Sequence, residues 1–130
     1  MSDEIVAFCC ENSAYAAADL AGREGLHYSE RVRIIRVPCV GRVDALHILK
    51  AFEAGCAAVV VLGCEFGACR HINGNKRAKR RVEYTNSLLS DVGMRPKSLA
   101  MFTVAPNAPH RFVNIIEKVE RSLKEPTVEL

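Results

Sequence analysis

The sequence predicts a single α/β domain built on a four-stranded parallel sheet with flanking helices. Short apolar runs rich in β-branched residues alternate along the 130 residues with alanine-rich or amphipathic stretches. The run AAVVVL (57–62) is apolar at every position, which is typical of a strand buried on both faces. Strand and helix alternate four times, which is the pattern of βαβ units with parallel strands and helices on both faces.

Four stretches are the predicted strands. Each is short and largely apolar, as the strands of a parallel sheet are. They are 5–10 (IVAFCC), 32–37 (VRIIRV), 57–62 (AAVVVL) and 99–104 (LAMFTV). Pro38 follows the second strand and Gly63 follows the third, and these two residues mark their C-terminal ends.

Four helices are predicted to alternate with the strands. They span 14–21, 45–54, 75–92 and 107–123. Gly22, Gly55 and Gly93 follow the first three helices directly, and glycine commonly ends a helix. Asp44 is placed to cap the second helix.

The expected domain covers residues 1–123, and the tail 124–130, which carries Pro126, is expected to be loose. The sequence contains no internal repeat, low-complexity segment or second-domain linker. The elements therefore predict one flavodoxin- or Rossmann-like domain whose ligand site lies at the C-terminal edge of the strands.

Composition places the chain among ordinary globular proteins. It is 49% hydrophobic and 25% charged, and its net charge of +3 gives no indication of a nucleic-acid binder. No apolar stretch reaches the roughly 18 residues that a membrane-spanning helix needs. The N-terminus MSDE is acidic and runs directly into a predicted strand, so we expect no signal peptide and a cytoplasmic protein. In that reducing compartment, six cysteines indicate metal ligands, redox groups or buried apolar residues rather than disulfides.

Five of the six cysteines are expected at one edge of the sheet. The C-terminal ends of parallel strands meet at the edge where open α/β sheets bind ligands. The cysteines at or just beyond these ends are Cys9, Cys10, Cys39, Cys64 and Cys69. Cys56 precedes the third strand and is expected at the opposite edge. Thiolates gathered in one place repel one another unless a metal neutralises them, so the grouping favours metal or cluster ligation.

Several other readings stay open on the residues alone. Any one of these cysteines could be a small buried apolar residue. A catalytic thiol has only His71 near it, two residues after Cys69, and a C-x-x-C redox pair is absent. Structural zinc also accepts four cysteines, but usually from paired C-x2–4-C knuckles. Cys64 and Cys69 form instead a C-x4-C spacing, which also occurs in plant-type 2Fe–2S ferredoxins and modestly favours iron–sulfur over zinc.

Three consecutive blocks of the sequence resemble a known family. They are AFCCENSAYAAADLAG (7–22), VRIIRVPCVGRVDALHILKAFEAG (32–55) and VLGCEFGACRHINGNKRAKRRV (61–82). In this order, over nearly the whole chain, they resemble the delta subunit family of methyl-viologen-reducing hydrogenase. The resemblance implies one 2Fe–2S cluster and an electron-relay role with no substrate chemistry of its own.

The resemblance also implies two kinds of partner. One is a hydrogenase or formate-dehydrogenase-type electron donor, and the other is a flavin-containing heterodisulfide-reductase-like subunit that accepts the electrons. The alternative function is a zinc-bound or cluster-free adaptor that holds two redox enzymes together without carrying electrons.

One position departs from the family pattern. Where the family reads C-C-x-x-C in its first block, this chain has Cys9, Cys10 and then Ser13. Four of the remaining cysteines suffice for a 2Fe–2S cluster. Neighbouring strand residues point to opposite faces, so Cys9 and Cys10 are not expected to bind one cluster together. We favour Cys10, which is closer to the loop edge, and the expected cluster and metal ligands are Cys10, Cys39, Cys64 and Cys69.

The surroundings of this expected site allow two interpretations. The nearby glycines either let backbone N–H groups approach sulfur or are ordinary turn residues. Nearby basic side chains either offset the charge of thiolates and sulfides or are solvated surface groups. The glycines are Gly41, Gly63, Gly67 and Gly74, and the basic residues are Arg42, Arg70 and His71.

The basic run KRAKRR (76–81) opens the third predicted helix. It is either a solvated helix face or a docking surface for an acidic partner. Tyr84 is the one aromatic residue close enough to stack on a base, so nucleic-acid binding is not expected.

Overall fold

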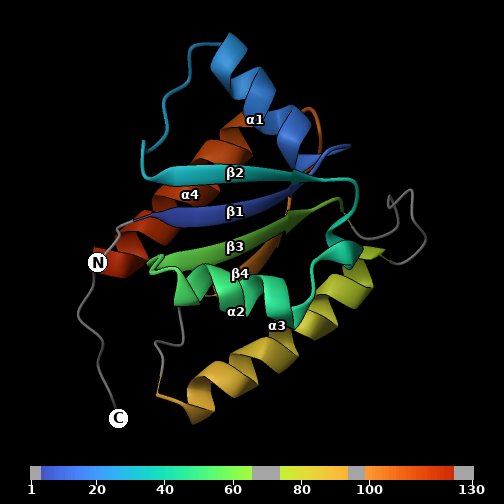
Figure 1. Ribbon diagram of the computed structural model, residues 1–130. Coiled ribbons are helices and arrows are strands. Elements are labelled where there is room, and N and C mark those ends of the chain that lie inside the picture. Colours follow the sequence, from blue (N-terminus) through green and yellow to red (C-terminus); the bar gives the residue numbers. More distant parts are fainter. Residues whose placement is uncertain (1–3, 66–73, 94–98, 125–130) are drawn as a thin grey trace.

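A four-stranded sheet lies between two layers of helices in the computed structural model, which describes residues 4–65, 74–93 and 99–124 (Figure 1). The elements in chain order are β1 (Ile5–Cys10), α1 (Ala14–Arg23), β2 (Val32–Val37), the 3₁₀ turn η1 (Val40–Arg42), α2 (Ala45–Glu53), β3 (Ala58–Gly63), α3 (Gly74–Asp91), β4 (Leu99–Thr103) and α4 (Pro109–Lys124). Lys124, the first residue of the expected tail, is the last residue of α4, and the rest of that tail lies outside the described residues.

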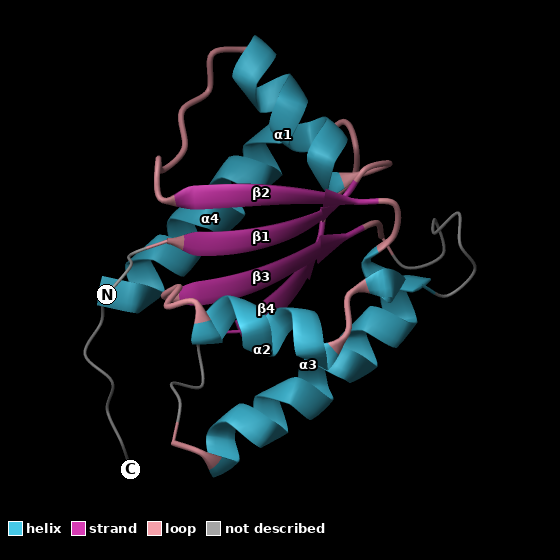
Figure 2. Ribbon diagram, viewed as in Figure 1, coloured by secondary structure: helices cyan, strands magenta, loops and turns pink. Residues whose placement is uncertain are grey.

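All four strands are parallel, in the order β2-β1-β3-β4, which confirms the predicted fold class (Figure 2). The chain runs from β1 outward to β2, then crosses back over β1 to β3 and continues to β4. Right-handed crossovers in opposite directions place their helices on opposite faces. Accordingly α1 lies with α4 on one face, and α2 lies with α3 on the other. The direction in which successive strands are added to the sheet reverses between β1 and β3. Open α/β sheets bind ligands at this kind of position.

The pleat of the central strand β1 divides the core into two layers. The side toward α1 and α4 carries Ile5, Ala7 and Cys9, and the side toward α2 and α3 carries Val6, Phe8 and Cys10. β1 and β3 are buried at every position, as the unbroken apolar run 57–62 predicts for β3. Their burial anchors the C-terminal ends of both strands in the middle of the sheet.

The end of α1 differs from its prediction. α1 does not stop before Gly22 but continues to Arg23, and the chain turns at Gly25, which has a φ of 72°. The Leu26 N–H donates to the Ala21 carbonyl oxygen at 2.9 Å. The Gly25 N–H donates to the Gly22 carbonyl oxygen at 3.2 Å, which completes a Schellman motif. The prediction was wrong because glycine is tolerated inside a helix, and the glycine that adopts the left-handed conformation comes three residues later.

The predicted cap and the other glycine stops are confirmed. The Asp44 side chain accepts from the His47 N–H (3.2 Å), and His47 Nδ1 accepts from the Asp44 N–H (3.1 Å), which together form a capping box. The hydrogen bond from the His47 backbone lowers the pKa of the Asp44 carboxyl. Gly55 (φ 99°) and Gly93 (φ 82°) follow α2 and α3 in the left-handed conformation.

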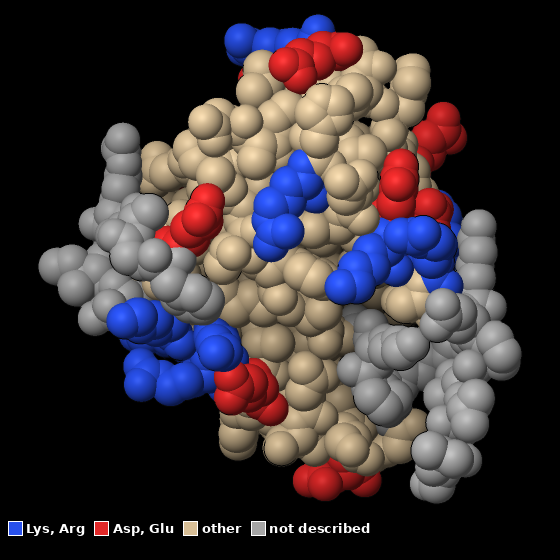
Figure 3. Space-filling model, turned by 180° about the vertical axis from the view of Figure 1, so that it is seen from behind, with Lys and Arg blue, Asp and Glu red and all other residues tan. Residues whose placement is uncertain are grey.

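The described helices are those of a globular domain. None of them is both long enough and apolar enough to cross a membrane. The side of the molecule seen in Figure 3 carries basic and acidic side chains scattered over uncharged surface. Neither sign of charge dominates that side, so it does not form the basic stripe of a nucleic-acid binder.

Candidate metal centre

Three of the four expected ligands lie at the C-terminal edge of the sheet. Cys10 is the last residue of β1, Cys39 directly precedes η1 after β2, and Cys64 directly follows β3. Because β2, β1 and β3 are neighbours in the sheet, these cysteines end three adjacent strands. All three are buried. Cys69, the fourth expected ligand, lies outside the described residues.

Cys9 and Cys10 face opposite layers, as the strand pleat predicts. Cys9 is fully buried among the apolar residues under α1 and α4. Burial, with a smaller contribution from Cys10, raises the pKa of Cys9 to about 12. Cys10 faces the other layer, which includes Val40 and Val43 from the loop after Cys39. The two neighbouring thiols therefore have different surroundings, one apolar and closed and the other next to the loop edge.

The loop after β2 brings Cys39 close to the end of β1. The Cys10 thiol donates to the Pro38 carbonyl oxygen at 3.9 Å, so Cys10 lies beside the residue that precedes Cys39. The Gly41 N–H donates to Cys39 Sγ at 3.3 Å. Of the two interpretations left open for Gly41, the hydrogen bond supports the approach of its N–H to sulfur. An N–H group directed at cysteine sulfur stabilises negative charge on that sulfur.

Asn75, the second residue of α3, holds the end of β3. Its side chain is buried, and its Nδ2 donates to the Cys64 carbonyl oxygen (3.1 Å) and to the Glu65 carbonyl oxygen (3.0 Å). The same amide nitrogen donates to Cys64 Sγ at 3.7 Å. Sequence reasoning used Asn75 only as the predicted start of a helix. An amide side chain at a helix start directly after a cysteine loop was the signal that could have identified it.

Close backbone packing joins η1, β3 and α3 beside these cysteines. A Cβ at Gly41 would lie 2.8 Å from the Cα of Gly74, the first residue of α3. A Cβ at Gly63 would lie 2.8 Å from Val40 Cγ2. Nonbonded atoms do not approach that closely, so both positions require glycine for packing rather than for a turn conformation.

Arg81 ties α3 to the loop that carries Cys39. Its Nη1 donates to the Gly41 carbonyl oxygen and to the Val43 carbonyl oxygen, the latter at 3.3 Å. The other basic residues of the run 76–81 are exposed, whereas Arg81 is half-buried. The interpretation of the whole run as a solvated or docking face is therefore wrong at Arg81, because its side chain is engaged inside the domain.

The remaining expected residues are placed as follows. Cys56 lies between α2 and β3 at the opposite edge, as predicted, and burial raises the pKa of its thiol. Arg42 is exposed. Ser13 is buried, and its hydroxyl has no hydrogen-bond partner among the described residues. Three further expected residues, Gly67, Arg70 and His71, lie outside the described residues.

The cysteines at the strand ends provide part of what a thiolate-ligated metal group requires. Among the described residues, no three His, Cys, Asp or Glu side chains are already placed to hold a metal ion. Cys10, Cys39 and Cys64 nevertheless fit such a group chemically, because they are cysteine side chains at three adjacent strand ends. Two of their sulfurs already face N–H donors. A fourth thiol, Cys69, follows in the segment 66–73.

Comparisons with known proteins agree on one family. The family model described as methyl-viologen-reducing hydrogenase, delta subunit, matches residues 5–125. The chain is 39% identical to the iron-sulfur subunit of the vhu F420-non-reducing hydrogenase of Methanopyrus kandleri, over 96% of both chains. It is 37% identical to the subunit of the same name from Methanocaldococcus jannaschii, over 92% of this chain and 89% of that protein.

A third relative is much longer. The chain is 34% identical to part of one subunit of the ferredoxin:CoB-CoM heterodisulfide reductase of Methanosarcina mazei, and the match covers 93% of this chain but 15% of that longer protein. A domain like this one therefore occurs both as a separate subunit and as a segment of a larger one. With a family model that spans nearly the whole chain and relatives of matching length, this chain belongs to the methyl-viologen-reducing hydrogenase delta subunit family.

Proposed function

We propose that this chain is an electron-transfer subunit that carries one 2Fe–2S cluster at the C-terminal edge of its sheet. The observation that carries the proposal is the meeting of Cys10, Cys39 and Cys64 at three adjacent strand ends, in a chain whose relatives are named iron-sulfur subunits. The family resemblance supplies the cluster type and the role of a relay.

The proposed ligands are Cys10, Cys39, Cys64 and Cys69. Cys10 is preferred to Cys9 because it faces the layer that contains the loop after Cys39, whereas Cys9 faces α1 and α4. A 2Fe–2S cluster, when bound, supplies storage and transfer of one electron at a time. The residues of the chain hold it through thiolates, and hydrogen bonds from Gly41 and Asn75 to sulfur favour the more negative, reduced state.

The proposed partners are an electron donor and an electron acceptor. The donor is a hydrogenase or a formate-dehydrogenase-type enzyme, as membership in a hydrogenase subunit family supports. The acceptor is a flavin-containing heterodisulfide-reductase-like subunit. The similarity of this chain to a segment of a heterodisulfide reductase subunit supports that choice, because a similar domain is covalently part of such an enzyme. We place this relay in the cytoplasm and its working domain within residues 1–123.

Anaerobic purification of the full chain tests the proposal. We expect two irons and two acid-labile sulfides per chain, and a visible absorption band that dithionite bleaches. The reduced protein is expected to show the electron paramagnetic resonance signal of a single 2Fe–2S centre. A four-iron centre with full iron loading would correct the cluster type and leave the relay in place.

The alternative is the zinc-bound or cluster-free adaptor. It is favoured by one observation, namely that the described thiols are not already placed as a group of three around a metal position. The same preparation decides between the two functions. Stoichiometric zinc, or a colourless and metal-free chain that still joins two redox enzymes, would establish the adaptor function and contradict the electron-transfer function.

A further inference from the structure

β2 is the least covered strand of the sheet. It carries three exposed residues, Arg33, Ile35 and Arg36, whereas the other edge strand, β4, carries none. Figure 1 shows β2 at the upper edge of the sheet, with α1 above it and α2 below the middle strands. An uncovered edge strand with exposed apolar residues is a surface that proteins normally protect or use for binding.

A hollow lies beside β2 on the α2 side. Ile35 is 42% exposed there and borders a cavity of about 440 Å³. Val6 and Phe8 of β1 and Ala51 of α2 complete an apolar lining, and Lys50 adds a positive charge. The hollow exists because α2 packs beside β3 and α3 and leaves the β2 side of this face open.

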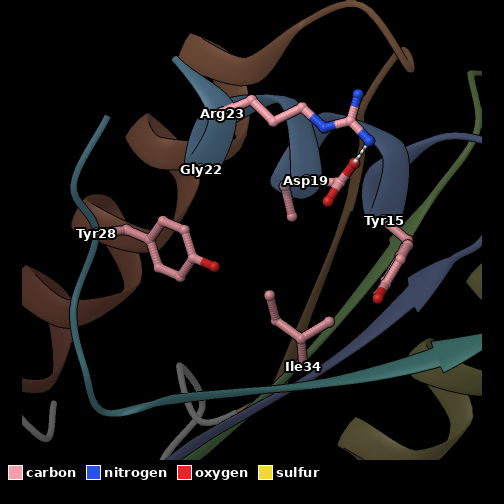
Figure 4. A pocket seen from close by; sticks show the side chains of 7 residues that line it. Tyr15, Asp19, Gly22, Arg23, Tyr28 and Ile34 are labelled. Carbon is pink, nitrogen blue, oxygen red and sulfur yellow. Dashed lines mark ion pairs between the residues drawn. The ribbon is translucent and has the colours of Figure 1, made fainter. Parts of the chain in front are cut away.

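A second hollow lies beside β2 on the opposite face, next to α1. Its volume is about 370 Å³, and Ile34 of β2 lines it. Figure 4 shows Tyr15 and Tyr28 on either side of this hollow, with Ile34 between them. The ion pair between Asp19 and Arg23 (3.2 Å) lies above it on α1. β2 is therefore hollowed along both of its faces.

Basic side chains accompany both isoleucines. Arg33 shares the α2 side with Ile35, and its Nε lies 2.7 Å from Glu4 Oε2. Arg36 shares the α1 side with Ile34. Each face of β2 thus presents one isoleucine beside one arginine.

Arg36 also lies over the ring of Tyr15, at 5.4 Å from the ring centre, so its guanidinium lies beside one of the residues that line the hollow. Among the residues of β2 and the lining of the two hollows, Arg23, Arg33, Arg36 and Lys50 outnumber Glu4 and Asp19, which leaves an excess of positive charge. A surface of this kind attracts carboxylates and excludes other basic surfaces.

We propose that the β2 edge is the docking surface for an acidic protein partner, whose apolar side chains fill the two hollows and whose carboxylates meet Arg33 and Arg36. The existence of such a partner rests on the proposed function. A second copy of this chain is disfavoured as the occupant, because two β2 edges brought together would oppose their arginines. A protein occupant is favoured because a segment similar to this chain also occurs within a longer subunit, of which it makes up 15%, so that it is joined there to further polypeptide.

Site-specific photocrosslinking tests the surface within the intact assembly. Para-benzoylphenylalanine replaces Ile35 in the full chain, the assembly is purified through a tag on that chain, and the crosslinked peptide is sequenced. We expect a crosslink to a different subunit, in a peptide with Asp or Glu near the attachment point. A crosslink to a second copy of this chain, or to a peptide without acidic residues, overturns the stated chemistry.

Affinity measurements supply the second arm. Ile35→Glu is expected to weaken binding of the purified partner at least about tenfold, since a few buried anchor residues carry most of the binding energy of an interface and Glu would place a charge in the hollow. Arg33→Glu with Arg36→Glu is expected to slow association and to remove most of its salt dependence. Val92→Glu is the matched control, because Val92 is an exposed apolar residue (75%) that directly follows α3, away from β2. The affinity of the Val92→Glu variant for the partner should equal that of the wild type.

Measurements of folding and metal content distinguish failure of the docking surface from failure of the proposed electron-transfer function. Thermal unfolding of Ile35→Glu is compared with that of Ile35→Gln, and iron and sulfide are measured for every variant. Unchanged affinity in a folded, iron-loaded Ile35→Glu protein overturns the docking surface and leaves the relay intact. A wild-type chain without iron overturns the relay, and the crosslink then decides the docking surface by itself.

Discussion

The two helix layers cover the same sheet but are built in different ways. Under α1 and α4 the core is continuous and apolar, from Ala17 and Ala21 to Phe112 and Ile116, all fully buried. Under α2 and α3 the apolar core gives way, at the C-terminal edge, to polar and backbone contacts that surround Cys10, Cys39 and Cys64. The first layer supplies stability, and the second combines stability with a site in which the sulfurs of Cys39 and Cys64 face N–H donors.

The pleat of β1 separates these two environments by a single residue. Cys9 belongs to the apolar layer, and Cys10 belongs to the layer that builds the site. The comparison teaches that neighbouring cysteines in a strand need not share a function, because the strand geometry sends them to opposite faces.

The largest expected effect is the loss of the proposed cluster on removal of one of its proposed ligands. Cys10→Ser, Cys39→Ser, Cys64→Ser and Cys69→Ser are each expected to lower iron and sulfide to a small fraction of the wild-type content. Cys9→Ser is expected to keep the cluster and to lower stability, because it places a hydroxyl in an apolar layer.

Iron and sulfide analysis with thermal unfolding checks both halves of this prediction. Cys56→Ser is the control, since Cys56 lies at the opposite edge, and it should retain the cluster. Full iron loading in Cys10→Ser together with loss of iron in Cys9→Ser would make Cys9 the ligand in place of Cys10. The site would then belong to the layer under α1 and α4.

The next largest effect concerns the close approach of η1 to α3. Gly41→Ala places a Cβ 2.8 Å from the Gly74 Cα, and relief of that overlap must move backbone, at an expected cost of about 1–3 kcal/mol. Gly22→Ala is the matched control in the other layer. Gly22 is helical and has open space around its Cβ position, so alanine should stabilise the domain by about 0.5–1 kcal/mol. Chemical denaturation of both variants measures the change in unfolding free energy, which should be negative for Gly41→Ala and positive for Gly22→Ala. Equal destabilisation of the two variants would contradict the packing argument.

Asn75→Ala tests the polar contacts that distinguish the layer under α2 and α3 at the end of β3. The substitution leaves the Cys64 and Glu65 carbonyl oxygens without their amide donor, which is expected to cost about 1–2 kcal/mol in unfolding free energy. It also removes an N–H donor from Cys64 Sγ, so the reduction potential of the proposed cluster should fall. Spectroscopic redox titration separates this electronic effect from the loss of stability. A potential equal to that of the wild type would mean that Asn75 acts on the backbone alone.

The smallest expected effect lies on the outer surface of α3. Lys76 and Arg80 are exposed, so Lys76→Glu with Arg80→Glu should leave the cluster spectrum and stability unchanged. If this face meets the acidic surface of a partner, association at low salt should slow by a few-fold, as for charges at an interface rim. Arg81 is left out of the pair because it holds the Cys39 loop. A low-salt association rate of the double variant equal to that of the wild type would leave the helix as a solvated face.

Much of the fold follows from local patterns. The strands begin and end within a residue of their predicted limits, because buried parallel strands are short apolar runs between charged residues, glycines or prolines. The start of α2 also follows, since Asp44 has the side chain that a capping box needs. Parallel alternation was sufficient to place Cys10, Cys39 and Cys64 at one edge and Cys56 at the other.

Other features depend on hydrogen bonds that the pattern of residue types does not specify. Gly22 and Gly25 are both glycines, and only the hydrogen bonds at the end of α1 select Gly25 as the turn residue. Arg81 looks like the other basic residues around it until α3 packs against η1 and supplies two carbonyl acceptors.

The sequence by itself determined the order of elements, the parallel sheet and the edge at which the cysteines gather, because these depend on periodicity and chain direction. The tertiary structure alone decided the strand order β2-β1-β3-β4, which makes the strands that end near Cys10, Cys39 and Cys64 adjacent. It also decided that Asn75 faces Cys64 and that Ile35 lies beside an open hollow. The physical reason is that strand order and helix placement depend on which surfaces pack together, and local sequence does not encode that choice.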